Sequence, residues 1–136
     1  DSAMLSLDDL VFAIGDGDVA AIERAADRSF QEGASPITIL RAAGRHFLRL
    51  HAVSSAAEID TAIARLRPPV FFKQLPRFKE QLRRWSGSHL AQALDRLVRA
   101  EMDCKRTGMP AETVCRRVLL EIALAPRARP RDRAAG

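Results

Sequence analysis

The segment "SPITILRAAGRHFLRLHAV", residues 35–53, constrains the fold more than any other part of the chain. Ser35 is a favoured N-cap residue, and Pro36 suits the first position of a helix. Apolar residues then recur at helical spacing in two neighbouring stripes, one through Leu40 and Phe47 and the other through Leu50. A helix that is apolar over so wide an arc needs neighbours on more than one side. The segment therefore predicts an all-α bundle with this helix at its centre.

The other periodic segments of the 136-residue chain also have helical spacing, and none has the alternation of a strand. Capping residues, glycines and prolines separate them. They predict one helical domain over residues 1–126, with six or seven helices at about 6–14, 18–32, 36–53, 55–66, 76–85, 88–106 and 110–124. Residues 127–136, "RARPRDRAAG", contain no large apolar residue, so we expect a disordered basic tail there.

Several positions are expected to have particular environments. Ser6 is predicted to cap the first helix, and Gly44 to let a neighbouring helix approach closely. His51 shares a stripe with Phe47, so we expect a partly buried histidine with one hydrogen bond rather than a metal ligand. The two cysteines are expected to be reduced core thiols, which pack like small apolar residues, rather than a redox pair. The predicted core comprises Leu40, Phe47, Phe78, Trp85, Leu97, Cys104, Cys115 and Leu119.

The formal net charge of +5 is unevenly distributed along the chain. Residues 1–64 carry five Arg against ten Asp and Glu, whereas residues 65–85 carry seven Lys and Arg against one Glu. A basic patch of this kind is typical of contact with nucleic acid or with acidic partners, and it is equally compatible with a solvated surface. The cations concerned are Arg65, Arg67, Lys73, Arg77, Lys79, Arg83 and Arg84, and we expect all of them to lie on the outside.

The aromatic residues among these cations are predicted to be apolar anchors. Phe78, Leu82 and Trp85 recur at helical spacing after Pro76, which indicates a buried stripe. Phe71 and Phe72 are expected to pack with Leu75 as a plug that holds the preceding turn on the bundle. The alternative is that their rings are exposed beside the cations, as in proteins that stack single-stranded nucleic acid on aromatic residues.

The sequence contains none of the common catalytic or nucleotide-binding motifs. There is no GxxxxGK[ST] phosphate loop, no HExxH pair and no GxSxG elbow. His46 and His51 lie about 140° apart around a helix, so they cannot share a metal ion. The two cysteines form no CxxC pair, which favours a reducing compartment such as the cytoplasm. We therefore expect no enzyme activity, no cofactor, no metal and, because no apolar run approaches 18 residues, no membrane span.

The order of the helical segments resembles the C-terminal region of the delta subunit of the bacterial DNA polymerase III clamp loader, in its alphaproteobacterial form. The likeness covers about residues 5–125. It rests on four runs in succession: "LDDLVFAIGDGDVAAIERAADRSFQEG", "SPITILRAAGRHFLRLHAV", "RPPVFFKQLPRFKEQLRRWS" and "LAQALDRLVRAEMDCKRTGMPAETVCRRVLLEIA". Within the second, "SPITILRAAGRHFLRL" is similar to the central helix of the family's collar. The chain does not begin with Met, and we expect it to be a fragment of a longer protein.

The resemblance implies a helical collar that joins subunits rather than an enzyme. Its expected partners are the clamp-loader ATPase subunits and delta-prime in a heteropentamer, and its expected location is the bacterial cytoplasm, near the nucleoid. The first helix belongs either to the collar or to the preceding lid domain. The sliding clamp would be bound by the family's N-terminal domain, so no clamp-binding residue is transferred to this chain.

A basic helical domain that binds nucleic acid by itself is the alternative. Such modules usually present a short recognition helix with Arg, Lys, Asn or Gln on one exposed face. The 36–53 helix is too apolar for that role, and the acidic first half of the chain would repel phosphate. The sequence therefore favours the assembly module. A weak electrostatic contact of the basic segment with DNA or with acidic partner subunits remains compatible with both hypotheses.

Overall fold

A computed structural model of the chain describes residues 2–127, and all regular structure in that range is helical. The predicted all-α bundle is confirmed. The seven α-helices of these residues are α1 (Ser2–Asp16), α2 (Val19–Gln31), α3 (Pro36–Ser54), α4 (Ile59–Ala64), α5 (Leu75–Arg84), α6 (Gly87–Cys104) and α7 (Ala111–Leu124). Short 3₁₀ helices, η1 (Phe72–Gln74) and η2 (Ala125–Arg127), precede α5 and follow α7. From residue 128 on, the predicted tail lies outside the described residues.

Three helices begin at capping residues that can be recognised in the sequence. The side chains of Asp18, Ser35 and Ser86 each accept a hydrogen bond of 3.0–3.1 Å from the backbone N–H three positions later. These bonds satisfy N–H groups that the first turn of a helix leaves without a partner. Local sequence therefore determines where α2, α3 and α6 begin.

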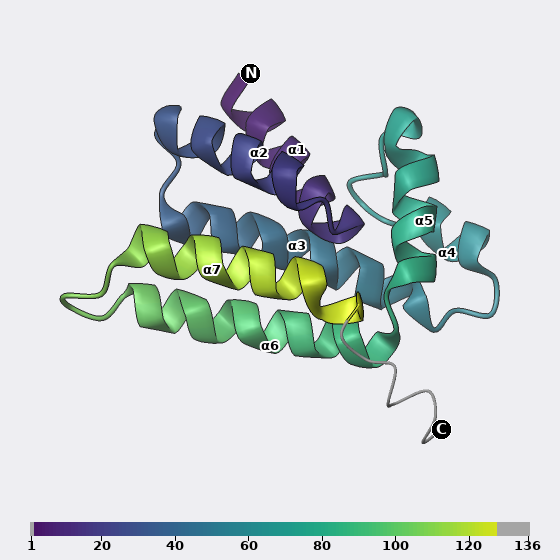
Figure 1. Cartoon of the computed structure of the whole chain (residues 1–136). Helices are drawn as coiled ribbons and strands as arrows, with labels where there is room; N and C mark the ends of the chain where they lie inside the picture. Colours follow the sequence, from purple (N-terminus) through teal and green to yellow (C-terminus); the bar gives the residue numbers. More distant parts are fainter. Residues whose placement is uncertain (1, 128–136) are drawn as a thin grey trace.

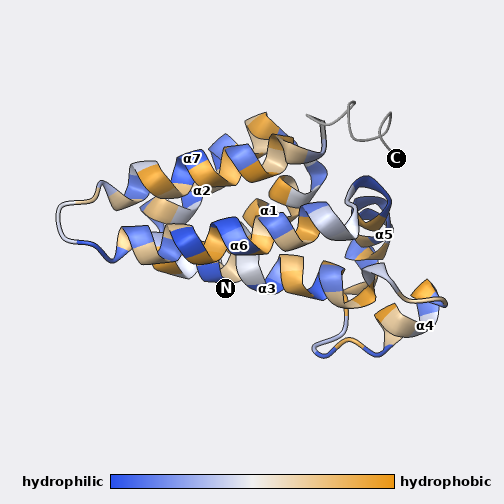
Figure 2. Ribbon diagram, turned by 90° about the horizontal axis from the view of Figure 1, so that it is seen from below, coloured by the Kyte–Doolittle hydropathy of each residue, from blue (hydrophilic) through white to orange (hydrophobic). Residues whose placement is uncertain are grey.

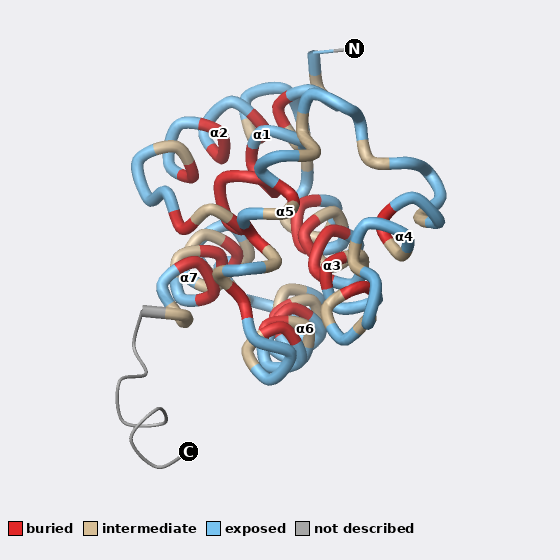
Figure 3. Tube along the Cα trace, turned by 90° about the vertical axis from the view of Figure 1, so that its right-hand side faces the viewer, coloured by how far each residue is buried: buried red, intermediate tan, exposed pale blue. Residues whose placement is uncertain are grey.

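The central helix of the bundle is α3, as predicted (Figure 1). It runs alongside α6 and α7, while α1 and α5 also pack against it. In the end view of Figure 3 the buried parts of α3, α6 and α7 turn toward one another. Figure 2 shows apolar and polar residues alternating along these helices, as expected for helices that bury one side and expose the other.

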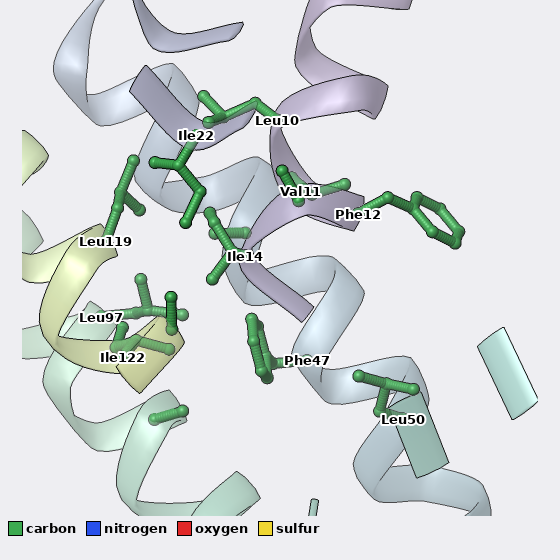
Figure 4. Packing of buried hydrophobic residues seen from close by; sticks show 14 of the residues in the cluster. Leu10, Val11, Phe12, Ile14, Ile22, Phe47, Leu50, Leu97, Leu119 and Ile122 are labelled. Carbon is green, nitrogen blue, oxygen red and sulfur yellow. The ribbon is translucent and has the colours of Figure 1, made fainter. Parts of the chain in front are cut away.

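Side chains from all seven α-helices contribute to one apolar cluster, part of which is shown in Figure 4. Phe47 of α3 points into it together with Ile14 of α1 and Leu119 of α7, so α1 and α7 share one core. The ring of Phe47 also meets that of Trp85 edge-on, with 4.8 Å between centroids. Seven of the eight residues predicted for the core are buried, namely Leu40, Phe47, Phe78, Trp85, Leu97, Cys115 and Leu119.

Cys104, the eighth predicted core residue, is only partly buried. It is the last residue of α6, where no further turn covers its side chain. Its Sγ lies 3.5 Å from the carbonyl oxygen of Ala111 at the start of α7. Both cysteines are free thiols, as predicted.

The first and fourth helices differ in length from the prediction. Helix α1 begins at Ser2, so Ser6 lies inside it and is not an N-cap. The Ser6 hydroxyl is buried and donates to the carboxylate of Glu32 just after α2. A serine followed by acidic residues is compatible with a helix that has already begun, which explains the error. Helix α4 is reduced to Ile59–Ala64.

Two predictions for α3 were wrong for the same reason. A Cβ on Gly44 would meet no atom within 4 Å, so no helix approaches there, and His51 is exposed. The buried face of α3 is instead the neighbouring stripe through Ala43, His46 and Leu50. Because Phe47 lies at the border of the two stripes, its burial is compatible with either one.

Candidate functional site

The basic segment, residues 65–85, forms an irregular loop, η1 and α5 on one side of the bundle (Figure 1). Several of its cations pair with nearby carboxylates. Arg77 contacts Asp16 of α1 at 2.7 Å, and Lys79 contacts Asp60 of α4 at 2.8 Å. Arg83 contacts Glu80 within α5 at 3.0 Å. The charge of α5 is therefore largely balanced by its neighbours, which weakens the case for a phosphate-binding face on that helix.

The prediction that Arg84 lies on the outside is wrong. Its side chain is partly buried, and its Nη2 donates a hydrogen bond of 2.7 Å to the carbonyl oxygen of Ala123. That carbonyl belongs to the last turn of α7, where backbone oxygens lack partners within the helix. Arg84 therefore stabilises the junction of α5 and α7.

The remaining cations of the segment are exposed on the loop and η1. Arg67 Nη1 donates hydrogen bonds of 2.8 Å to the carbonyl oxygens of Ala64 and Leu66. Lys73 Nζ lies 5.9 Å from the centroid of the Phe72 ring. Arg65 is exposed as well. These three cations are the part of the predicted basic patch that faces solvent without a carboxylate of the described residues within ion-pair distance.

Phe71 and Phe72 are exposed, contrary to the predicted apolar plug. Phe71 is 53% exposed and Phe72 is 70% exposed, and their rings contact each other with centroids 5.0 Å apart. Leu66, Val70 and Leu75 are the partly buried residues that hold this loop on the core. Periodicity could not identify the inward side chains here, because residues 65–71 are not helical.

A groove of about 580 Å³ opens between α1, α3 and this loop. We define the groove by residues that line it from all three: Met4 and Leu5 of α1, Arg45 and Arg49 of α3, and Pro68, Pro69, Val70 and Phe71 of the loop. Phe12, His46 and Phe78 also line it and, being buried, form its floor. Figure 4 shows Phe12 turned away from the main apolar cluster. The lining is mostly apolar, as in many binding sites.

Beneath the groove, a network of polar side chains joins α1, α3 and α5. His46 Nε2 lies 2.7 Å from Gln81 Oε1. The Gln81 amide nitrogen donates to the Phe12 carbonyl oxygen at 3.0 Å and to Asp16 at 2.8 Å. The Gln81 amide nitrogen faces two acceptor oxygens, so the amide oxygen is the atom that faces His46. That oxygen can only accept, and the neutral imidazole therefore carries its proton on Nε2. Burial lowers the pKa of His46, while the hydrogen bond to Gln81 partly offsets that effect.

Two arginines of the groove have no carboxylate of the described residues within ion-pair distance. Arg45 is exposed, while Arg49 is partly buried and its Nη1 donates a hydrogen bond of 2.7 Å to the carbonyl oxygen of Pro68. Partial burial lowers the pKa of the Arg49 guanidinium. The acidic residue of the lining, Asp8, accepts a hydrogen bond from the side chain of Gln74. The groove lining therefore carries two cations against one carboxylate, a net charge of +1.

The described residues offer no arrangement for metal chemistry. No three His, Cys, Asp or Glu side chains among residues 2–127 gather closely enough to hold a metal ion. Within the same residues, none of the helices combines the length and the apolar character needed to cross a bilayer. No protein-family model, curated protein or solved structure matches the chain.

The basic segment could be predicted from the sequence, but the groove could not. Its floor combines residues from three helices, and Met4 and Leu5 were not singled out because the predicted first helix began after them. One signal could have found it, namely that "VFF" follows two prolines outside any helical period. Side chains in such a segment have no regular core face.

Proposed function

We propose that this chain is the collar module of the delta subunit of a bacterial DNA polymerase III clamp loader. One observation carries the proposal. The run that resembles the family's central collar helix, residues 35–50, begins at the N-cap of α3 and continues along that helix, which is the central helix of this bundle. If the likeness came from surface residues alone, there would be no reason for this run to form the central helix of the bundle.

In this proposal the module contributes assembly rather than catalysis. Its partners are the clamp-loader ATPase subunits and delta-prime in a heteropentamer that loads the sliding clamp during replication in the cytoplasm. Contact with the clamp itself is assigned to the family's N-terminal domain, and no ATP hydrolysis is assigned to this chain. Val98 and Met102, spaced four residues apart on α6, are 60% and 64% exposed, and large apolar side chains on an outer face suit a contact between subunits.

The test is co-purification of the chain with the ATPase subunits and delta-prime at moderate salt. We expect one complex in size-exclusion chromatography with multi-angle light scattering, containing all the partners. Met102→Glu should weaken the complex if the outer face of α6 is a contact, whereas Arg117→Gln, an exposed change on α7, serves as the control. A chain that is folded by circular dichroism but elutes alone at micromolar concentrations contradicts the proposal.

Single-stranded nucleic acid binding is the second candidate, and the exposed Phe71 and Phe72 favour it. The exposed Lys73 lies beside the Phe72 ring, which in turn contacts the ring of Phe71. Bases stack on such rings, and each stacked base contributes about 1–3 kcal/mol. Against this candidate, Arg77, Lys79 and Arg83 are engaged by carboxylates.

A fluorescence titration with labelled oligo(dT) at low and physiological salt tests the second candidate. Binding through phosphates alone weakens steeply with salt because released counterions supply its free energy. Stacking predicts residual binding at physiological salt that Phe71→Ala and Phe72→Ala together remove. If the double variant binds as the parent does, the aromatic pair has no part in the contact.

A further inference from the structure

The groove between α1, α3 and the 68–71 loop is too apolar at its rim to be an ordinary solvated surface. Met4 is 70% exposed and Leu5 is 65% exposed, and with Phe71 they place three large apolar side chains beside one depression. Exposed apolar groups gathered in this way mark sites of association. We propose that this groove binds an amphipathic helix of another protein, one that carries acidic residues beside its apolar face.

The aliphatic side chains favour a protein over a nucleic acid in this groove. Bases stack on aromatic rings, whereas Met4 and Leu5 gain most from burial against other aliphatic or aromatic groups. The floor residues Phe12 and Phe78 are already buried and offer apolar contact rather than exposed ring faces. An apolar helix face would cover the rim and floor together.

The backbone around the groove favours a helix over an extended peptide. An added strand needs unpaired N–H and C=O groups along an edge. Two walls of the groove are the helices α1 and α3, whose backbone groups are paired internally beyond the first turn, and the third begins with Pro68 and Pro69, which have no N–H. A helix pairs its own backbone groups and brings only side chains to the surface.

Charge complementarity indicates the acidic residues of the partner. Arg45 and Arg49 line the groove without a carboxylate of the described residues within ion-pair distance, and Arg49 is partly desolvated. A carboxylate placed over them would be attracted by both and would form bidentate hydrogen bonds with either. The chain's own segment 128–136 does not fit, because it carries three Arg against one Asp and has no large apolar residue.

This inference goes beyond the proposed function, since it holds whichever assembly the bundle joins. Its test uses the full chain and a fluorescein-labelled peptide of about 16 residues, or about four helical turns. The probe has Leu along one face and Glu on the others. A second peptide has Lys in place of every Glu, and a third has Ser in place of every Leu.

We expect the Leu/Glu probe to bind in fluorescence anisotropy with a dissociation constant at or below about 100 μM, and the other two peptides at least about tenfold more weakly. Leu5→Ser and Phe71→Ser should each weaken binding by about tenfold or more. Arg45→Glu should remove the preference for Glu over Lys. Leu48→Ser is the matched control, because Leu48 is a 58% exposed apolar residue of α3 that does not line the groove, and it should change nothing.

Three results would overturn the proposal. The first is no binding of the Leu/Glu probe up to about 1 mM by a chain that is folded. The second is binding that neither Leu5→Ser nor Phe71→Ser weakens, or binding that Leu48→Ser weakens as much as they do. The third is occupation of the groove by a different ligand, seen either as oligo(dT) displacing the probe or as a dimer in sedimentation that Leu5→Ser dissociates. None of these readouts depends on clamp-loader subunits, so the proposed function can fail separately.

Discussion

The indole nitrogen of Trp85 donates a hydrogen bond of 2.9 Å to the carbonyl oxygen of Gly15. Both groups are buried, and the bond joins the end of α5 to the last full turn of α1. The same glycine faces Gln81, one turn earlier along α5. A Cβ at position 15 would overlap the Gln81 carboxamide, with Nε2 at 2.7 Å. The two helices can lie this close because residue 15 has no side chain.

Gly15→Ala is therefore expected to destabilise the protein by about 1–3 kcal/mol. Gln81 cannot simply move aside, because its amide is held by His46, the Phe12 carbonyl and Asp16. The control is Gly44→Ala, which adds a methyl group where no atom lies within 4 Å and should stabilise α3 by about 0.5–1 kcal/mol. Urea denaturation followed by circular dichroism measures both. Equal effects of the two variants would show that α1 and α5 are not closely packed.

Phe47→Ala should reduce the free energy of unfolding by about 3–5 kcal/mol, because Phe47 is fully buried in the shared cluster. Phe72→Ala removes the same atoms from an exposed position and should change stability by less than about 0.5 kcal/mol. Thermal and urea unfolding give the comparison. A loss below about 1 kcal/mol for Phe47→Ala would place α3 at the surface.

Stability should fall as the pH falls from about 7 through 6, and His46 should account for part of the slope. Burial lowers the pKa of His46 in the folded protein. In the unfolded chain this histidine takes up a proton near pH 6.5, whereas in the folded protein the imidazole is still neutral at that pH. Stability is lost through this window and the loss levels off below the folded pKa.

His46→Gln should flatten that slope, and His51→Gln, at the exposed histidine of the same helix, is the matched control. The free energy of unfolding is measured at closely spaced pH values for the three proteins. Only the slopes are compared, since removing the buried imidazole also lowers stability at every pH. Parallel curves for the parent and His46→Gln would refute the assignment.

The two thiols should react at very different rates. Burial raises the pKa of Cys115 to about 12, and burial also raises the pKa of the partly exposed Cys104. Since the thiolate is the nucleophile, Cys104 should react with Ellman's reagent at pH 8 well before Cys115. Cys115 should react only when the chain unfolds. Cys104→Ser should abolish the fast phase. A disulfide between the two after mild oxidation would instead support a redox pair.

The parts of the fold that follow helical periodicity could be predicted from the sequence. Burial of Phe78 and Trp85 follows from spacing within one helix, and the starts of α3 and α6 follow from capping chemistry. Periodicity is less certain where two apolar stripes adjoin. On α3 the stripe with His51 is predicted to be a core face, so His51 is expected to be partly buried and the burial of His46 is not predicted, since both stripes contain enough apolar residues to form a core face.

The candidate site was predicted less well because its geometry is not local. The cations of α5 were identified, but their partners Asp16 and Asp60 lie on other helices that only the fold brings near. Phe71 and Phe72 are predicted to form an apolar plug with Leu75, but both rings are exposed. In a loop after two prolines no period indicates which side chains point inward, and Val70 and Leu75 take those positions.

The shared core of α1 and α7 has a consequence for synthesis of the chain. Ile14 and Leu119 meet in one cluster although about a hundred residues separate them. At typical translation rates of about 5–20 residues per second, the nascent α1 must wait roughly 5–20 s before α7 is made. During that interval the first helix can pack against α2, α3 and, once it is made, α5, but the side of α1 that faces α7 stays uncovered. A chaperone that recognises nascent apolar helices would find its binding site there, and would lose it once α7 docks.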